Sequence, residues 1–71
     1  MAQSLPNNQE AEQAVLGAML SDSKHATKAL EELKPEDFFW ENNKEIFSAL
    51  GSLNDNLIPI DMVTLVNELN K

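Results

Sequence analysis

Apolar side chains recur at intervals of three and four residues in four short stretches of this chain, and no stretch of useful length alternates strictly between apolar and polar residues. Spacing of three and four places side chains on one face of an α-helix, whereas a half-buried strand requires alternation. Proline, asparagine, aspartate and serine separate the four stretches. The pattern predicts an all-α fold, a small orthogonal bundle of four main helices with a short turn near residues 35–39.

The first predicted helix begins at Asn7, because Asn7 and Glu10 stand at capping-box spacing and Pro6 prevents an earlier start. Its wide apolar arc indicates a central position in the bundle. The arc consists of Ala11, Ala14, Val15, Leu16, Ala18, Met19 and Leu20. Gly17 lies on the polar side, where either close contact with a neighbouring backbone or a tolerated weak point would explain it.

The second predicted helix follows Asp22, whose carboxylate can accept the free amides of the first turn. The helix ends before Pro35, since the residue that precedes a proline is disfavoured in the helical region. Pro35 suits the first position of a new turn, and the acidic Glu36 and Asp37 suit the positive end of its dipole. The apolar face comprises Ala26, Ala29, Leu30 and Leu33.

The third predicted helix begins near Asn42 or Asn43 and runs out in "GSLNDN", where Gly51 and the asparagine and aspartate residues weaken helicity. Its apolar face comprises Ile46, Phe47, Leu50 and Leu53. Residues 57–60 form an extended apolar connector, after which Asp61 caps a fourth helix. The inner positions of this last helix are predicted to be Met62, Leu65, Val66 and Leu69.

Length and composition predict one helical domain over residues 1–71. With 42% hydrophobic residues the chain can fold, but a chain of 71 residues hides only about 60% of its unfolded surface, so its core is thin. There is no cysteine, which removes disulfides and thiolate metal sites and is consistent with a reducing cytoplasm. No signal peptide or membrane-spanning run is present in the sequence, so we expect a cytoplasmic location and no membrane contact.

Charge argues against direct contact with nucleic acid. Aspartate and glutamate number 12 against 5 basic residues, all of them lysine, and the formal net charge is −7. DNA-binding proteins draw much of their affinity from cations that replace counterions on phosphates, and arginine supplies much of the base reading. We therefore expect no nucleic-acid contact from this segment.

The sequence also lacks the patterns of reactive sites. The two glycines, Gly17 and Gly51, are not clustered before a helix start, so no phosphate-binding loop is predicted. His25 is the only histidine and is interpreted as a solvated side chain. The acid pairs at residues 31–32 and 36–37 are adjacent in sequence, and adjacent helical residues do not face each other. We predict no catalytic, cofactor-binding or metal-binding residue in this chain.

The stretch "LKPEDFFWENNKEIF" places three aromatic rings side by side. Adjacent helical residues point about 100° apart, so the three rings cannot all face one core. Phe38 is predicted to fill the core between the helices, and Trp40 is predicted at the rim, where it could contact a protein partner. An external ligand for the aromatic run remains the alternative. The predicted core is Leu16, Leu20, Leu30, Leu33, Phe38, Ile46, Phe47, Leu50 and Leu65.

Three blocks of the sequence, "LPNNQEAEQAVLGAML", "LKPEDFFWENNKEIFSAL" and "PIDMVTLVNEL", resemble the start of the amino-terminal domain of DnaB-type replicative DNA helicases. The blocks cover nearly the whole chain in the family's order, which makes the resemblance specific. The resemblance implies a parent protein that is a ring-shaped hexamer and unwinds DNA at the replication fork with ATP and Mg²⁺ in a separate motor domain. It implies other helicase subunits, primase and, in some lineages, a helicase loader as partners.

Compared with the proteins that it resembles, this sequence stops before the helical hairpin and the motor domain. It is therefore expected to be a non-catalytic fragment without a cofactor of its own. Only framework roles carry over, to Glu12 and Gln13 in "EAEQAVLG", Phe38 after "KPED" and Asp61 in "PID". The leading hypothesis is a scaffold and docking domain of a replicative helicase. The alternative is an independent small acidic helical adaptor that binds a partner helix.

Overall fold

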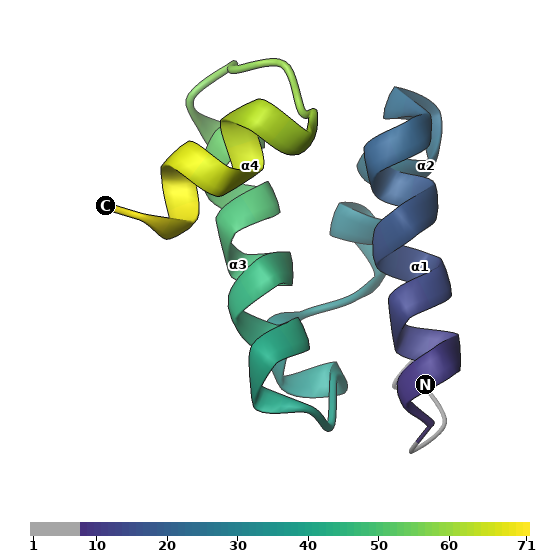
Figure 1. The fold of residues 1–71 in the computed structure, drawn as a ribbon. Helices are drawn as coiled ribbons and strands as arrows, with labels where there is room; N and C mark the ends of the chain where they lie inside the picture. The colour runs from purple at the N-terminus through teal and green to yellow at the C-terminus, as the bar shows by residue number, and fades with distance from the viewer. Residues whose placement is uncertain (1–7) are drawn as a thin grey trace.

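The computed structural model describes residues 8–71, and its helices are α1 (Gln9–Ser21), α2 (Ser23–Glu32), the short 3-10 turn η1 (Pro35–Asp37), α3 (Glu41–Asp55) and α4 (Met62–Leu69). Residues 8–71 contain no strand, so the predicted all-α bundle of four helices and a turn is confirmed. In Figure 1 α1 and α2 form a hairpin beside α3, and α4 lies across the far end of α3. None of the helices in the described range is long and apolar enough to span a bilayer.

Short polar side chains begin three of the helices. The predicted cap Asn7 lies outside the described residues, and the observed cap of α1 is Asn8, whose Oδ1 accepts from the Ala11 amide at 3.1 Å. Asp22 caps α2 through the Lys24 amide at 2.8 Å, and Asp61 caps α4 through the Thr64 amide at 2.9 Å. The predicted caps at Asp22 and Asp61 are therefore confirmed.

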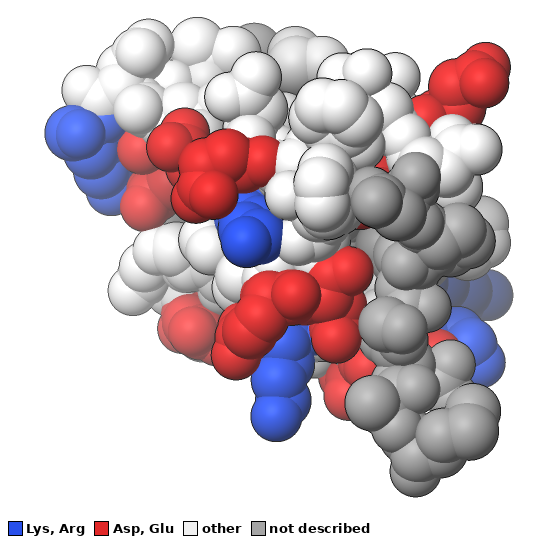
Figure 2. All heavy atoms as spheres, turned by 90° about the horizontal axis from the view of Figure 1, so that it is seen from below, with Lys and Arg blue, Asp and Glu red and all other residues white. Residues whose placement is uncertain are grey.

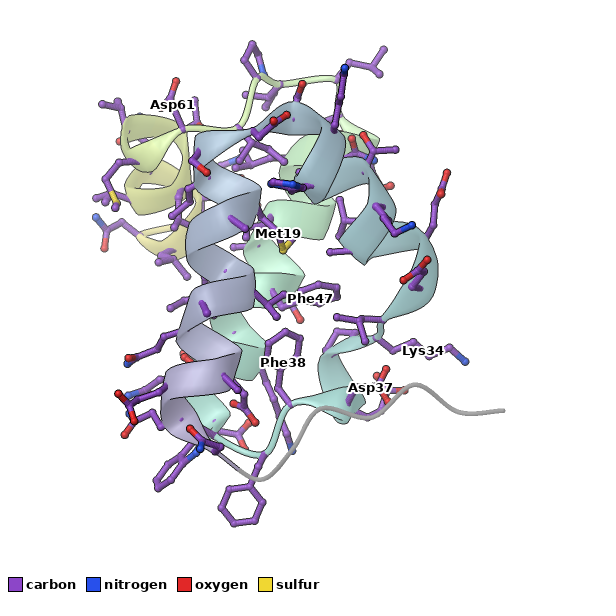
Figure 3. The ribbon with its side chains drawn as sticks, turned by 90° about the vertical axis from the view of Figure 1, so that its right-hand side faces the viewer. Met19, Lys34, Asp37, Phe38, Phe47 and Asp61 are labelled. Atoms are coloured by element: carbon purple, nitrogen blue, oxygen red, sulfur yellow. The ribbon has the colours of Figure 1, made fainter. Side chains whose placement is uncertain are left out.

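The turn η1 reverses the chain between α2 and α3. Pro35 is its first residue, as the sequence predicts, and the Asp37 carboxylate accepts a hydrogen bond from the Lys34 amide at 2.8 Å (Figure 3). The Phe38 amide then donates to the Pro35 carbonyl at 3.1 Å and closes the turn. This closed turn sets the direction in which the Phe38 ring enters the bundle.

The core lies where the hairpin of α1 and α2 meets α3. Phe38 and Phe47 are 1% and 2% exposed, and their ring centroids are 4.9 Å apart (Figure 3). The other buried apolar residues are Leu16, Met19, Ala26, Ala49, Leu50, Leu53 and Leu65. Four further residues from the predicted core, namely Leu20, Leu30, Leu33 and Ile46, are half-buried and pack around it.

α3 begins one residue earlier than predicted and ends within the predicted stretch. It begins at Glu41 instead of Asn42 or Asn43, and it continues through Gly51 to Asp55. The predicted end within "GSLNDN" is confirmed, and Leu53, which the prediction places on the helix, is 2% exposed.

Gly17 and Gly51 differ in their surroundings. A Cβ atom at Gly17 would have no neighbour within 4 Å, so close backbone contact does not explain this glycine. A Cβ atom at Gly51 would lie 3.5 Å from Leu30 Cδ2, which is an ordinary contact. Neither glycine is therefore required by packing.

The carboxyl end of α3 holds a leucine in a backbone conformation that suits glycine. Leu57 has φ 59°. The Ile58 amide donates to the Leu53 carbonyl at 2.9 Å and the Leu57 amide to the Asn54 carbonyl at 3.1 Å, which is the Schellman pattern of a helix end. The left-handed conformation costs an L-residue about 1–2 kcal/mol.

Replacing Leu57 with glycine is therefore expected to raise the free energy of unfolding by about 1 kcal/mol, because glycine adopts φ near 60° without the Cβ clash. The leucine side chain is 91% exposed, so its loss removes no core contact. Urea denaturation followed by circular dichroism measures the change. Leu57→Ala, which keeps the Cβ atom, is the matched control and should leave stability nearly unchanged.

α4 does not face the core in the way its sequence predicts. Of the four predicted inner positions only Leu65 is buried, whereas Met62, Val66 and Leu69 are 60%, 45% and 43% exposed. The side of α4 that lies on α3 instead includes Glu68, whose Oε2 accepts a hydrogen bond from Ser52 Oγ at 3.0 Å. The prediction for these three residues was wrong because α4 crosses the end of α3 (Figure 1), and of its residues only Leu65 is buried, with Thr64 and Glu68 partly buried.

Candidate functional site

A buried carboxylate joins α1 to the start of α3. The Glu12 side chain comes from the first turn of α1 and is 0% exposed. Its Oε2 accepts from the Phe39 amide at 2.7 Å, and its Oε1 accepts from Asn43 Nδ2 at 2.9 Å and from the Trp40 amide at 3.4 Å. Asn43 is itself 4% exposed. Together these contacts hold the backbone of the Phe39–Trp40 segment against α1.

The arrangement fixes the two residues before α3 to another helix, α1. The residue at the N-cap position is Trp40, whose side chain accepts no hydrogen bond from the helix. The first amides of a helix need acceptors, and a carboxylate is favoured at the positive end of the helix dipole. Glu12 lies near this positive end and accepts from the amides of Phe39 and Trp40 and from Asn43 Nδ2, and these donors explain how a charged group is tolerated without exposure to water.

The ionised form of Glu12 is favoured. Burial raises the pKa of this carboxyl, but the hydrogen bonds from Asn43, Phe39 and Trp40, with the positive charge of Lys44 nearby, lower it by more. The net pKa lies below the ordinary value for glutamate. The carboxylate is therefore charged at neutral pH and acts only as an acceptor.

Stability is expected to fall in acid because of this group. A carboxyl whose folded-state pKa is depressed stabilises the fold fully above its unfolded pKa, about 4.3 for glutamate, and loses that contribution as pH falls through the lower folded-state pKa. Urea denaturation from pH 7 to pH 3 should show the loss below about pH 4.5. In Glu12→Gln this part of the pH dependence should be absent, and an identical profile in both proteins would contradict the assignment.

Two aromatic side chains face outward directly beside this buried contact. Phe39 and Trp40 are 59% and 40% exposed, and their rings meet edge to face at 5.4 Å and 82°. Phe38, the preceding residue, points inward. The aromatic run is thus divided, with one ring in the core and two rings on the surface.

Other residues singled out by the sequence lie apart from this surface. His25 and Gln13 are exposed, on α2 and on the outer side of α1. Within residues 8–71 no group of three histidine, aspartate or glutamate side chains is placed to hold a metal ion. The aromatic pair with its buried carboxylate is the feature of the described chain best suited to binding.

Sequence reasoning placed Glu12 in the framework but did not find that it holds the segment before α3. A signal was present, since Glu12 stands four residues before Leu16 and seven before Met19, on the apolar face of α1. An acid on an apolar face needs hydrogen-bond donors from elsewhere in the fold. The spacing of apolar residues gave no comparable indication that Phe39 is exposed.

Comparison with known proteins agrees with the sequence blocks. The chain is 44% identical over 64 residues to the replicative DNA helicase DnaC of Bacillus subtilis and, to the same degree, to the replicative DNA helicase DnaB of Geobacillus stearothermophilus. Each alignment covers 90% of this chain and 14% of the relative. It is 39% identical over 66 residues to the replicative DNA helicase DnaB of Rhodothermus marinus, covering 93% of this chain and 7% of that protein. No solved structure matches significantly.

The chain therefore spans a small part of the length of these relatives. The family model described as the DnaB-like helicase N terminal domain matches residues 4–71, nearly the whole chain. The order of the sequence blocks, the all-α fold and this match agree, and the chain belongs to the DnaB-like helicase N-terminal domain family.

Proposed function

We propose that this chain is the non-catalytic, amino-terminal scaffold and docking domain of a hexameric, ATP-dependent replicative DNA helicase that unwinds duplex DNA at the replication fork. The observation that carries the proposal is the family match over residues 4–71 together with relatives that are replicative DNA helicases. In this proposal ATP and Mg²⁺ act in a motor domain outside these 71 residues. The domain contacts other helicase subunits and offers a surface to primase and, in some lineages, to a helicase loader.

The surface of the domain supports docking of proteins in preference to DNA. Figure 2 shows acidic side chains across the middle of the end of the molecule where α1 and α3 begin, with lysine side chains among and around them. A formal net charge of −7 repels phosphates, whereas the exposed aromatic pair has the character of a protein interface.

The docking role is best tested in the full helicase that carries this domain. Deletion of the domain is expected to weaken ring assembly, measured by sedimentation, and to abolish stimulation of unwinding by primase. A ring that assembles and responds to primase normally without the domain would contradict the proposal. Leu57→Ser, which changes only an exposed connector side chain, is the control for mutagenesis in the same protein.

The pure 71-residue chain is expected to hydrolyse no ATP, because the proposal places all nucleotide chemistry elsewhere. Phosphate release at millimolar ATP and Mg²⁺ measures this directly, with the full helicase as positive control. Turnover that persists after repeated purification would contradict the proposal.

A second candidate is an independent acidic adaptor that binds a partner helix. The exposed apolar side chains of α4, namely Met62, Val66 and Leu69, favour it because they form a row that a helix could cover. A reading frame that continues past Lys71 into an ATP-binding motif would exclude this candidate, and a stop codon directly after Lys71 would favour it.

A further inference from the structure

We propose that Phe39 and Trp40, with the acidic side chains beside them, dock a cationic protein segment that carries arginine or lysine next to an apolar side chain. This inference rests on the proposed docking function and names the chemistry of the partner. The surface consists of the aromatic pair and the carboxylates of Glu36, Glu41 and Glu45, which lie within five residues of the pair along the chain.

Exposure of the pair is the first observation. The core of this small domain is thin, and each aromatic side chain offers roughly 150–250 Å² to bury, yet 59% of Phe39 and 40% of Trp40 remain in contact with solvent. Exposed aromatic side chains are enriched at protein interfaces, where tryptophan often dominates the binding energy.

Rigid presentation is the second observation. Both residues have their amides held by the buried Glu12 carboxylate, and the Trp40 carbonyl accepts from the Lys44 amide at 3.0 Å in the first turn of α3. A surface whose backbone is fixed before binding loses less conformational entropy when a partner arrives. The pair is therefore prepared for binding and does not need to be ordered by it.

Charge identifies the partner. Within five residues of the pair along the chain stand three exposed glutamates, Glu36, Glu41 and Glu45, against two lysines, Lys34 and Lys44, and Lys44 Nζ lies 3.9 Å from Glu41 Oε1. Asp37 is also in that span, but its carboxylate is engaged by the Lys34 amide. The excess of carboxylates over lysines in this segment, on a chain of net charge −7, favours a guanidinium or ammonium group, which binds the exposed indole face by a cation–π contact.

The same charge argues against two other occupants. A second copy of this chain would bring another −7 to an acidic surface, and nucleic acid would bring phosphates. Both are repelled at moderate ionic strength, whereas a basic protein segment is attracted.

Fluorescence of Trp40 provides the primary test, because it is the single tryptophan of the chain and there is no tyrosine. The probe is a 15-residue helical peptide with two arginines flanking a leucine, and the matched peptide has glutamine in place of both arginines. The arginine peptide is expected to shift the Trp40 emission saturably at low salt and to bind more weakly in 0.5 M salt, which screens exposed charges. The glutamine peptide should bind at least about threefold more weakly.

Variants then separate this surface from nonspecific attraction. Trp40→Ser and Phe39→Ser are each expected to lower the affinity for the arginine peptide, measured by calorimetry, by about three- to thirtyfold, which is the range of a cation–π contact. Glu41→Gln should weaken it by a smaller factor. Leu57→Ser removes an exposed apolar side chain far along the chain and should bind like the parent. Circular dichroism checks that each variant keeps its helices.

Four results would overturn the proposal. They are equal binding of the glutamine peptide, unchanged affinity in Trp40→Ser, a dimer that Trp40→Ser abolishes, and binding of a single-stranded oligonucleotide in place of the peptide. Because peptide binding is measured on this chain and ring assembly on the full helicase, failure of one test leaves the other readable.

Discussion

Replacing Phe38 with alanine is expected to lower the free energy of unfolding by about 3–5 kcal/mol, the usual cost of deleting a buried phenylalanine ring. The ring is 1% exposed, lies 4.9 Å from the Phe47 ring and fills the space between the hairpin and α3 (Figure 3). Single cores of this size rarely supply more than about 3–5 kcal/mol in total. The variant should therefore be largely unfolded at 25 °C, which circular dichroism and urea denaturation would show.

Phe39→Ala provides the matched control, because it removes the same ring from the next position in the sequence. Phe39 is 59% exposed, so its truncation should change stability by no more than about 0.5 kcal/mol. Equal losses of stability in the two variants would contradict the inward and outward division of the aromatic run.

Replacing Glu12 with glutamine is expected to destabilise the fold by about 1–3 kcal/mol at pH 7, because a buried donor loses its acceptor. The carboxylate accepts from three donors, the amides of Phe39 and Trp40 and the side chain of Asn43. The glutamine side chain has one acceptor oxygen, and in place of the second carboxylate oxygen it has an NH₂ group, which cannot accept a hydrogen bond from these donors. Urea denaturation gives the loss, and amide chemical shifts of Phe39 and Trp40 report which hydrogen bonds have changed.

Glu10→Gln is the matched control, because it removes the same charge two residues before Glu12. Glu10 is also in the first turn of α1, but its side chain is exposed. It should alter stability by at most about 0.5 kcal/mol. If Glu10→Gln destabilised the protein as much as Glu12→Gln, net charge and not the buried contact would be responsible.

Local signals in the sequence predicted much of the fold. Asp22 and Asp61 are caps, and Pro35 opens a turn, because each acts on amides or dihedral angles within three residues of itself. Helical spacing likewise predicted four helices without reference to their packing. These features depend on short-range chemistry that a single sequence contains.

Features that depend on how helices cross were not predictable in the same way. The apolar positions of α4 form an arc wider than the strip that contacts α3, and spacing alone could not select Leu65 over Met62 and Val66. The binding partners of Glu12 stand 27, 28 and 31 residues later in the chain. Such contacts follow from the tertiary arrangement, so the candidate surface emerged only from the coordinates.

The contact of Glu12 with the start of α3 also bears on how the domain opens. Helix ends normally fray independently, and their amides exchange with solvent through small local fluctuations. Here the acceptor for the amides of Phe39 and Trp40, the two residues that precede α3, belongs to α1, so release of those amides requires this segment to separate from α1. The amino-terminal hairpin is thereby tied to the segment that leads into α3, and we expect hydrogen exchange at the Phe39 amide to be slow and to report their separation.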